Sequence, residues 1–129
     1  MHRGFARRTE KLYRQEKGYF DDNDNFVLGG HSLGGACAVL LASLLNEEGK
    51  RVENVYTFGM PRFVSAEFRE YYKQSGLDSV SRHYTTPRDP VVYKIPYIFD
   101  AIGDYEVVPC DEEDSLSHHD MSSYSKIWN

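Results

Sequence analysis

The sequence predicts an α/β fold in which helices flank a mostly parallel sheet. Short apolar runs typical of strands alternate along the chain with longer helical patterns, which is the order found in parallel sheets. One of these strands leads directly into a glycine-rich turn and then into an apolar helix. The 129 residues, of which 40% are apolar and 27% charged, have a globular composition and correspond to about one domain.

Each expected element follows from a local pattern. Residues 5–16 predict a charged helix, since apolar side chains recur there at helical spacing, and the Asp- and Asn-rich residues 21–25 predict a turn. Residues 33–46 predict a buried helix, because nearly every side chain there is apolar. The other expected elements are strands at 26–28, 52–58, 80–84 and 105–108, a helix at 65–74 and a last short helix within 115–129.

The glycine-rich turn between the strand at 26–28 and the apolar helix is a candidate nucleophile site. Residues 30–34 are Gly-His-Ser-Leu-Gly, which fits the pattern G-x-S-x-G. In this pattern the serine, Ser32, stands on a tight strand-to-helix turn, and side chains at Gly30 and Gly34 would clash. The N–H of Leu33 would then donate to a developing oxyanion at the positive end of the helix.

Two other interpretations of this turn are a plain connection and a phosphate cradle. The phosphate interpretation has less support, because the sequence contains neither G-x-x-x-x-G-K-[ST] nor G-x-G-x-x-G. The apolar strand before the turn and the apolar helix after it favour the nucleophile site.

Four segments of the chain resemble the fungal-type (class 3) lipases, a family with the α/β-hydrolase fold. Residues 30–36 (GHSLGGA) are similar to the nucleophile elbow of that family. In the same order as in the family, residues 2–5 (HRGF) resemble its H-x-G-F segment, residues 57–62 (TFGMPR) its T-F-G-x-P-R segment, and residues 88–91 (RDPV) the segment that carries the acid. Gly29 departs from the family, which usually has a small hydroxyl or aliphatic residue there. The resemblance extends over nearly the whole chain.

The resemblance also implies that part of the family's fold has no counterpart here. The chain begins at the H-x-G-F segment, so we expect a partial α/β-hydrolase fold that lacks the N-terminal strands, the lid and the loop with the second oxyanion donor. Residues 1–129 would form the C-terminal portion of a single class 3 lipase-like domain. The strand at 26–28 would be an exposed apolar edge that favours association with another chain, and the isolated chain would be weak or inactive.

The acid of the resulting triad is predicted to be Asp89, because α/β-hydrolases follow the chain order Ser, acid, His. Asp89 follows the strand at 80–84 and lies 57 residues after Ser32, about the family's spacing. Its role would be to orient the imidazole and stabilise the imidazolium. The alternative is an Asp-Pro turn formed for local reasons. Weaker rivals are Asp78, Asp100 and Asp104.

The base is predicted to be His119. Residues 119–124 (HDMSSY) resemble the family's H-x-x-x-x-Y ending, which favours His119 over the adjacent His118. An imidazole, which titrates near pH ~6.5, suits the transfer of the serine proton. The alternative is an exposed pair in a serine-rich loop, and the gap of 30 residues from Asp89 is shorter than expected for the fungal members.

No cofactor or metal is implied by the sequence. The adjacent side chains of residues 118 and 119 point apart, and Cys37 and Cys110, 73 positions apart, form neither a metal pattern nor a disulfide framework. Cys37 is interpreted as a small buried filler of the apolar helix. His2 is set aside because it lies near the terminus, the resemblance implies a structural role for His31, and His83 is interpreted as a satisfied core or edge residue of its strand. The aromatic residues Tyr93, Tyr97 and Phe99 could line an acyl groove, although such residues are more often core.

Composition limits the partners. The net charge of −5 argues against nucleic acid, and basic residues 1–20 and acidic residues 100–120 are interpreted as solvated faces. The longest apolar stretch has ten residues, whereas a membrane span needs about 20. The first residues show no apolar signal region, so we expect the cytoplasm by default.

The sequence therefore predicts a serine carboxylester hydrolase of lipase type that uses Ser32, Asp89 and His119. Its substrate would be a lipid or small ester, such as a triacylglycerol, reached through transient contact with a lipid interface. The alternative is a truncated or degenerate lipase domain without catalytic activity, which acts as an interaction module or is a non-functional fragment.

Overall fold

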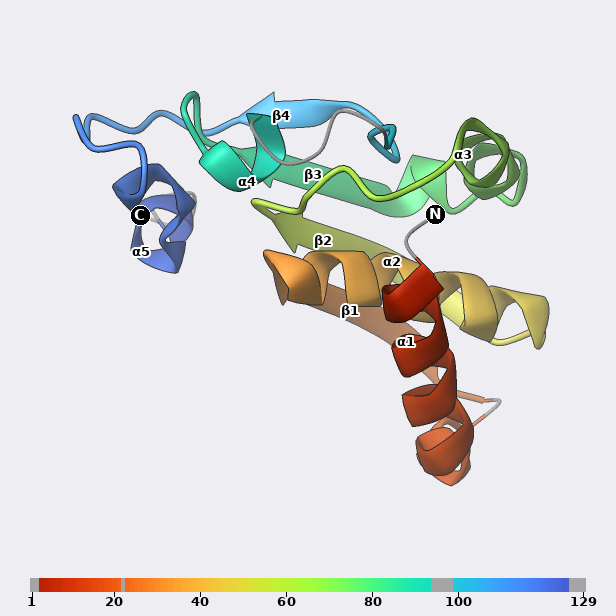
Figure 1. The fold of residues 1–129 in the computed structure, drawn as a ribbon. Helices are drawn as coiled ribbons and strands as arrows, with labels where there is room; N and C mark the ends of the chain where they lie inside the picture. The colour runs from red at the N-terminus through yellow and green to blue at the C-terminus, as the bar shows by residue number, and fades with distance from the viewer. Residues whose placement is uncertain (1–2, 22, 94–98, 126–129) are drawn as a thin grey trace.

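The computed structural model describes residues 3–21, 23–93 and 99–125, in which four strands form one parallel sheet. The strands are β1 (Asn25–His31), β2 (Arg51–Phe58), β3 (Ser81–Thr85) and β4 (Tyr105–Val107). They lie side by side in chain order, and each neighbouring pair is parallel (Figure 1). The predicted parallel α/β sheet is confirmed, and each predicted strand is present within a few residues of its expected bounds.

The helices also follow the predicted order. They are α1 (Arg3–Glu16), α2 (Leu33–Glu47), α3 (Ala66–Gln74), α4 (Pro90–Tyr93) and α5 (Met121–Tyr124), with short 3-10 turns η1 (Lys17–Tyr19), η2 (Asp78–Val80) and η3 (Ser117–His119). The short helix expected within residues 115–129 corresponds to η3 and α5. The sequence did not predict α4, because four residues are too few for a periodic pattern.

Helix α2 supplies five of the twelve buried residues of the main core cluster. Its side chains are apolar almost all round, so it packs directly onto β1 and β2, and its buried residues extend from Gly35 to Leu45. The core side chains around it share nearly complete burial and include Val39, Val55, Met60, Phe63, Val64, Tyr72 and Ile102. The positive end of α2 is thereby fixed at the carboxyl end of β1.

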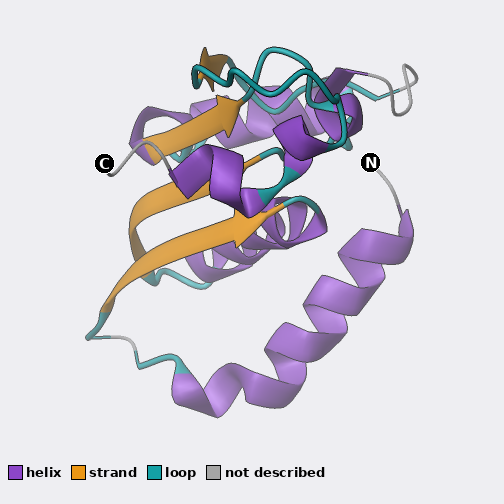
Figure 2. Cartoon of the chain, turned by 90° about the vertical axis from the view of Figure 1, so that its left-hand side faces the viewer, coloured by secondary structure: helices purple, strands orange, loops and turns teal. Residues whose placement is uncertain are grey.

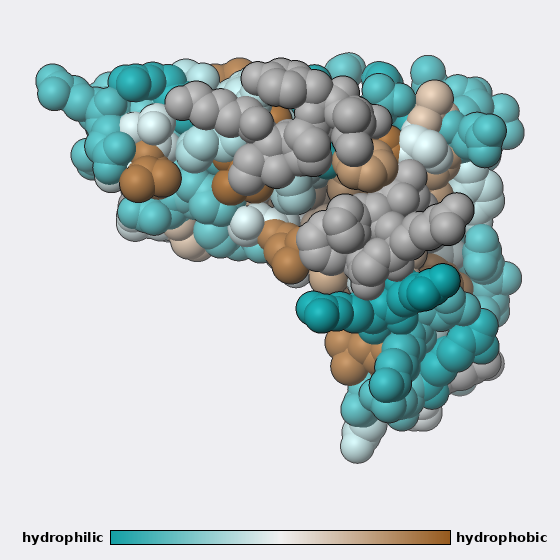
Figure 3. All heavy atoms as spheres, viewed as in Figure 1, coloured by the Kyte–Doolittle hydropathy of each residue, from teal (hydrophilic) through white to brown (hydrophobic). Residues whose placement is uncertain are grey.

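Helix α1 lies apart from the sheet (Figure 2). It packs against α2, with Thr9 and Tyr13 buried, while its outer surface carries exposed basic side chains such as Arg7 and Lys11. Hydrophilic residues accordingly dominate this part of the molecular surface at the lower right of Figure 3. The helix therefore reaches the rest of the fold mainly through α2.

Strand β1 lies at the edge of the described sheet, as predicted, and its Val27 side chain is 59% exposed. A cavity of about 400 Å³ lies beside it, lined by α1, α2 and β1 residues that include Tyr13, Leu28 and Cys37. The expectation that Cys37 is a buried filler is wrong, because this cavity leaves the side chain half-buried.

Candidate active site

Ser32 occupies a strained turn between the last residue of β1 and the first residue of α2. Its φ of 56° and ψ of −126° make it the only non-glycine residue with positive φ among those the structure describes. Its N–H donates to the carbonyl of Phe58 at the end of β2 (2.8 Å). Such strain persists only where surrounding packing enforces it, and it is characteristic of functional turns.

The glycines around Ser32 have different roles. A Cβ on Gly30 would lie 2.1 Å from the carbonyl oxygen of Gly34, so the predicted steric requirement holds there. A Cβ on Gly35 would lie 3.0 Å from the Cβ of Met60, a tight contact under the helix. A Cβ on Gly34 would meet nothing within 4 Å, so the predicted clash at this position is wrong. The clash at this turn is between a side chain at position 30 and the backbone carbonyl of Gly34, so it does not require Gly34 to lack a side chain.

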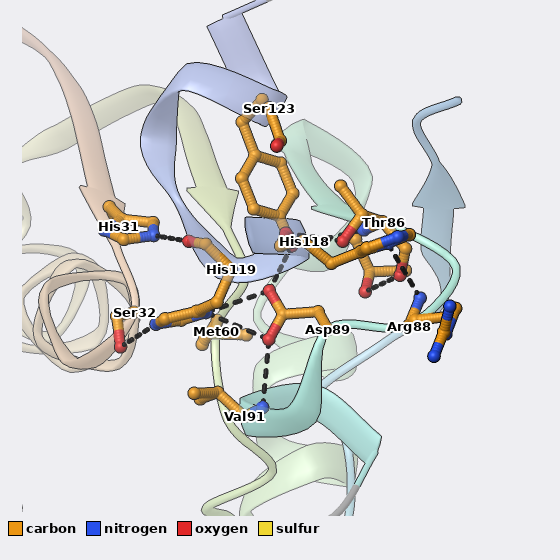
Figure 4. Close-up of polar contacts among 12 residues, drawn as sticks. His31, Ser32, Met60, Thr86, Arg88, Asp89, Val91, His118, His119 and Ser123 are labelled. Carbon is orange, nitrogen blue, oxygen red and sulfur yellow. Dashed lines mark hydrogen bonds and ion pairs between the residues drawn. The ribbon is translucent and has the colours of Figure 1, made fainter. Parts of the chain in front are cut away.

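The structure brings Ser32, His119 and Asp89 together (Figure 4). The Nε2 atom of His119 lies 2.9 Å from the Ser32 hydroxyl, and its Nδ1 atom lies 2.9 Å from each carboxylate oxygen of Asp89. Ser32 follows β1, Asp89 follows β3 and immediately precedes α4, and His119 ends η3. The three side chains therefore meet beyond the carboxyl ends of the parallel strands, where ligand sites of open α/β sheets form.

Asp89 is completely buried and fully partnered. Besides His119, its carboxylate accepts hydrogen bonds from the N–H of Val91 (2.9 Å) and from the hydroxyl of Tyr124. Burial raises the pKa of Tyr124 far above its usual value, and the hydrogen bond to Asp89 adds to this rise. Tyr124 therefore remains a donor, and it also accepts from the N–H of Thr86 (3.2 Å).

Gly59 lies against the Asp89 and His119 side chains, which the sequence did not predict. It has a φ of 62°, and a Cβ there would lie 2.6 Å from Asp89 Oδ2 and 3.1 Å from His119 Nδ1. The acid and the imidazole can meet only because this position has no side chain. The signal was present in the segment at 57–62, where a glycine directly follows the predicted strand.

His118 points away from Ser32 and is buried. Its Nδ1 accepts from the N–H of Arg88 (3.2 Å), and its Nε2 lies 2.7 Å from the carbonyl of Glu112. A carbonyl can only accept and an N–H can only donate, so these partners define a neutral ring with its proton on Nε2. The interpretation of residues 118 and 119 as an exposed pair is therefore wrong.

The other candidate residues lie elsewhere. His83 is buried in β3 and pairs with the Thr57 hydroxyl (2.7 Å), and burial lowers its pKa to about 4. The rival acids Asp78, Asp100 and Asp104 together line a separate cavity beside α3. Tyr93 is 39% exposed, and Tyr97 and His2 lie outside the described residues.

The N-terminus of α2 faces the same turn. Leu33 is the first residue of that helix, so its N–H belongs to the first turn, whose donors lack partners within the helix.

In the part of the chain that the structure describes, no group of three or more His, Cys, Asp or Glu residues could hold a metal ion. No helix of that part is long and apolar enough to cross a membrane.

The sequence model of the family described as "Lipase (class 3)" matches residues 1–99, which is more than half of the chain. The chain belongs to the class 3 lipase family. The matched region contains Ser32 and Asp89 and ends before His119. The choice of His119 as the candidate base therefore rests on its place in the structure and on its spacing to Tyr124.

Relatives and solved structures agree with this family. The chain is 40% identical over 82 residues to a protein named triacylglycerol lipase OBL1 from Arabidopsis thaliana, in an alignment that covers 59% of this chain and 16% of that protein. The fold is similar to Lip2 lipase from Yarrowia lipolytica (TM-score 0.70, 22% identity, 83% of this chain and 42% of that one). It is also similar to a lipase from Rhizopus microsporus var. chinensis (TM-score 0.65, 25% identity, 88% of this chain and 42% of that one).

This class 3 lipase chain thus has a partial α/β-hydrolase fold. It spans less than half the length of these two solved lipases and about a sixth of the length of the curated plant relative. Membership of the family and the lipase neighbours support lipid ester hydrolysis as the chemistry of the fold.

Proposed function

We propose that this chain carries the Ser-His-Asp triad of a carboxylester hydrolase that cleaves fatty-acyl esters such as triacylglycerols. Residues 1–129 would form the C-terminal portion of one class 3 lipase-like domain. The single observation that carries the proposal is the continuous chain of contacts from Ser32 through His119 to the buried Asp89. No metal or cofactor takes part in this reaction.

Each member of the triad has a defined step. His119 Nε2 takes the proton of Ser32 as the serine oxygen bonds to the ester carbonyl carbon, and the N–H of Leu33 stabilises the resulting oxyanion. The imidazolium then gives this proton to the leaving alcohol as the ester C–O bond breaks. Water repeats the sequence on the acyl-enzyme and releases the fatty acid and Ser32.

The electrostatic environment fits these steps. Asp89 is buried beside His119, so its negative charge acts through a medium of low dielectric constant and stabilises the imidazolium strongly. The Tyr124 and Val91 donors hold the carboxylate in place. Asp89 therefore needs no further movement when the proton is transferred.

A fluorophosphonate probe, which reacts with activated serines, tests the proposal directly. The folded chain should be labelled, and Ser32→Ala should abolish the label. His119→Ala should slow labelling and ester hydrolysis by several orders of magnitude, because triad members act as a unit, whereas His118→Ala should retain a correctly oriented base. Equal labelling of the wild-type chain and Ser32→Ala would refute Ser32 as the nucleophile.

A second candidate function is that of an interaction module without turnover. The observation that favours it is the open edge of β1, with the exposed Val27 and the adjacent cavity, since an unpaired edge accepts another strand. Sedimentation should then show self-association that Val27→Lys suppresses, while the fluorophosphonate probe leaves the chain unlabelled. A labelled chain would favour the hydrolase.

A further inference from the structure

We propose that His31 is a positioning residue, which holds the backbone of His119 so that the His119 ring faces Ser32 and Asp89 together. This inference rests on the proposed function, because it gives a residue outside the triad a role in orienting the base. His31 precedes the nucleophile directly, and it is the last residue of β1.

The contact is short and specific. The Nε2 atom of His31 lies 2.6 Å from the carbonyl oxygen of His119, a residue 88 positions away in the sequence. The ring centroids of the two histidines are 4.7 Å apart with an interplanar angle of 32° (Figure 4). A carbonyl accepts only, so His31 must carry its proton on Nε2. The strand that presents the nucleophile therefore also holds the base.

A second strand end holds the neighbouring peptide. The hydroxyl of Thr86, just after β3, donates to the carbonyl of His118 (2.6 Å). The N–H of His119 donates to the carbonyl of Leu116, the residue before η3 (3.0 Å). Two consecutive carbonyls, those of His118 and His119, are thus fixed by side chains from the carboxyl ends of two different strands. The peptide plane of His119 has little freedom to rotate.

Catalysis depends on this orientation. His119 must point Nε2 at Ser32 while Nδ1 remains at Asp89, and the backbone of residues 109–116 that leads to it has no helix or strand. A displacement of about 1 Å in such a constellation can cost about 100-fold in rate. The hydrogen bond from His31 limits that displacement without touching the substrate.

The test compares two amides at position 31. His31→Gln places its side-chain N–H group near the position of the imidazole Nε2–H, whereas the shorter side chain of His31→Asn cannot reach the His119 carbonyl. For p-nitrophenyl butyrate, His31→Asn should lower kcat about 100-fold and leave KM nearly unchanged. His31→Gln should recover most of the rate. Thermal melting of both variants shows whether each is folded.

Proton NMR supplies a readout that does not require turnover. The proton shared by His119 Nδ1 and the Asp89 carboxylate should give a far-downfield resonance in the wild-type chain and in His31→Gln. It should broaden or disappear in His31→Asn. If His31→Asn keeps both this resonance and the wild-type kcat, the positioning role of His31 is wrong although the triad stands. If the wild-type chain is neither labelled nor active, the proposed hydrolase fails, and the resonance still decides whether His31 orients His119.

Discussion

The hydroxyl of Tyr124 donates a hydrogen bond to the carboxylate of Asp89, which lies 35 residues earlier in the chain. Both residues are fully buried, so the bond forms where water cannot replace it. It connects the C-terminal helix α5 to the loop after β3 and gives the carboxylate a donor besides His119 and the N–H of Val91.

Tyr124→Phe should weaken both the fold and the proposed reaction. The variant leaves the buried carboxylate with one donor fewer, which should lower the free energy of unfolding by about 2 kcal/mol. If the less constrained carboxylate loses about 1.4 kcal/mol of transition-state stabilisation, kcat falls about tenfold. Urea unfolding and ester hydrolysis measure the two effects. Unchanged stability would show that the hydroxyl bond contributes nothing net.

Gly59→Ala should displace the acid and the base. A Cβ there overlaps the Asp89 carboxylate, so kcat should fall by at least about 100-fold. Gly76→Ala is the matched control, because Gly76 also has positive φ (86°) but its Cβ would meet nothing within 4 Å. The control should lose only about 1 kcal/mol of stability from backbone strain. Similar losses of kcat in both variants would contradict the steric role of Gly59.

The two glycines of the G-x-S-x-G turn should respond in opposite ways to alanine. Gly30→Ala would force a Cβ against the Gly34 carbonyl and should lower the free energy of unfolding by more than about 3 kcal/mol. Gly34→Ala lies in the first turn of α2 with open space, so it should stabilise the helix by about 0.5 kcal/mol. Chemical unfolding of the two variants measures both effects. Severe destabilisation by Gly34→Ala would show that a side chain at position 34 clashes as well.

His83 should make the stability depend on pH. Its pKa is lowered to about 4 by burial, so below an unfolded value of about 6.5 the unfolded chain takes up a proton that the folded chain does not. The free energy of unfolding should therefore fall as pH falls from about 6.5 to 4, by at most about 3 kcal/mol. His83→Phe should remove this part of the pH dependence. An identical slope in the variant would assign it to other groups.

The sequence predicted the elements whose patterns are long and local. The apolar run at 33–46 predicted α2 and its burial, and the glycines before and after Ser32 located the turn that Ser32 occupies. Spacing to Tyr124 distinguished His119 from His118, and the structure places His119 beside Ser32. These features depend on residues that are close in sequence or on a motif of fixed spacing.

The features that were missed depend on contacts between distant segments. The approach of Gly59 to Asp89 and the bond from His31 to the His119 carbonyl exist only after β1, β2 and β3 have paired. The four-residue helix α4 is too short for a periodic pattern, and the N–H of its second residue, Val91, donates to the Asp89 carboxylate. The predicted clash at Gly34 was wrong because the close contact joins the Gly30 Cβ position to the Gly34 backbone, and a side chain at position 34 takes no part in it.

The attachment of residues 118 and 119 to Thr86 and His31 has a consequence for which changes of length this chain can accept. The geometry of the base is set at its point of attachment and not by the length of chain that leads to it. Insertions and deletions in the exposed loop at 111–114 should therefore be tolerated where they keep the Glu112 and Glu113 carbonyls beside His118 and Arg88, because surface connections change length at little energetic cost. Chains with loops of different length there should keep the contacts of His119 with Ser32 and Asp89, so the proposed reaction does not require the interval of 30 residues between Asp89 and His119.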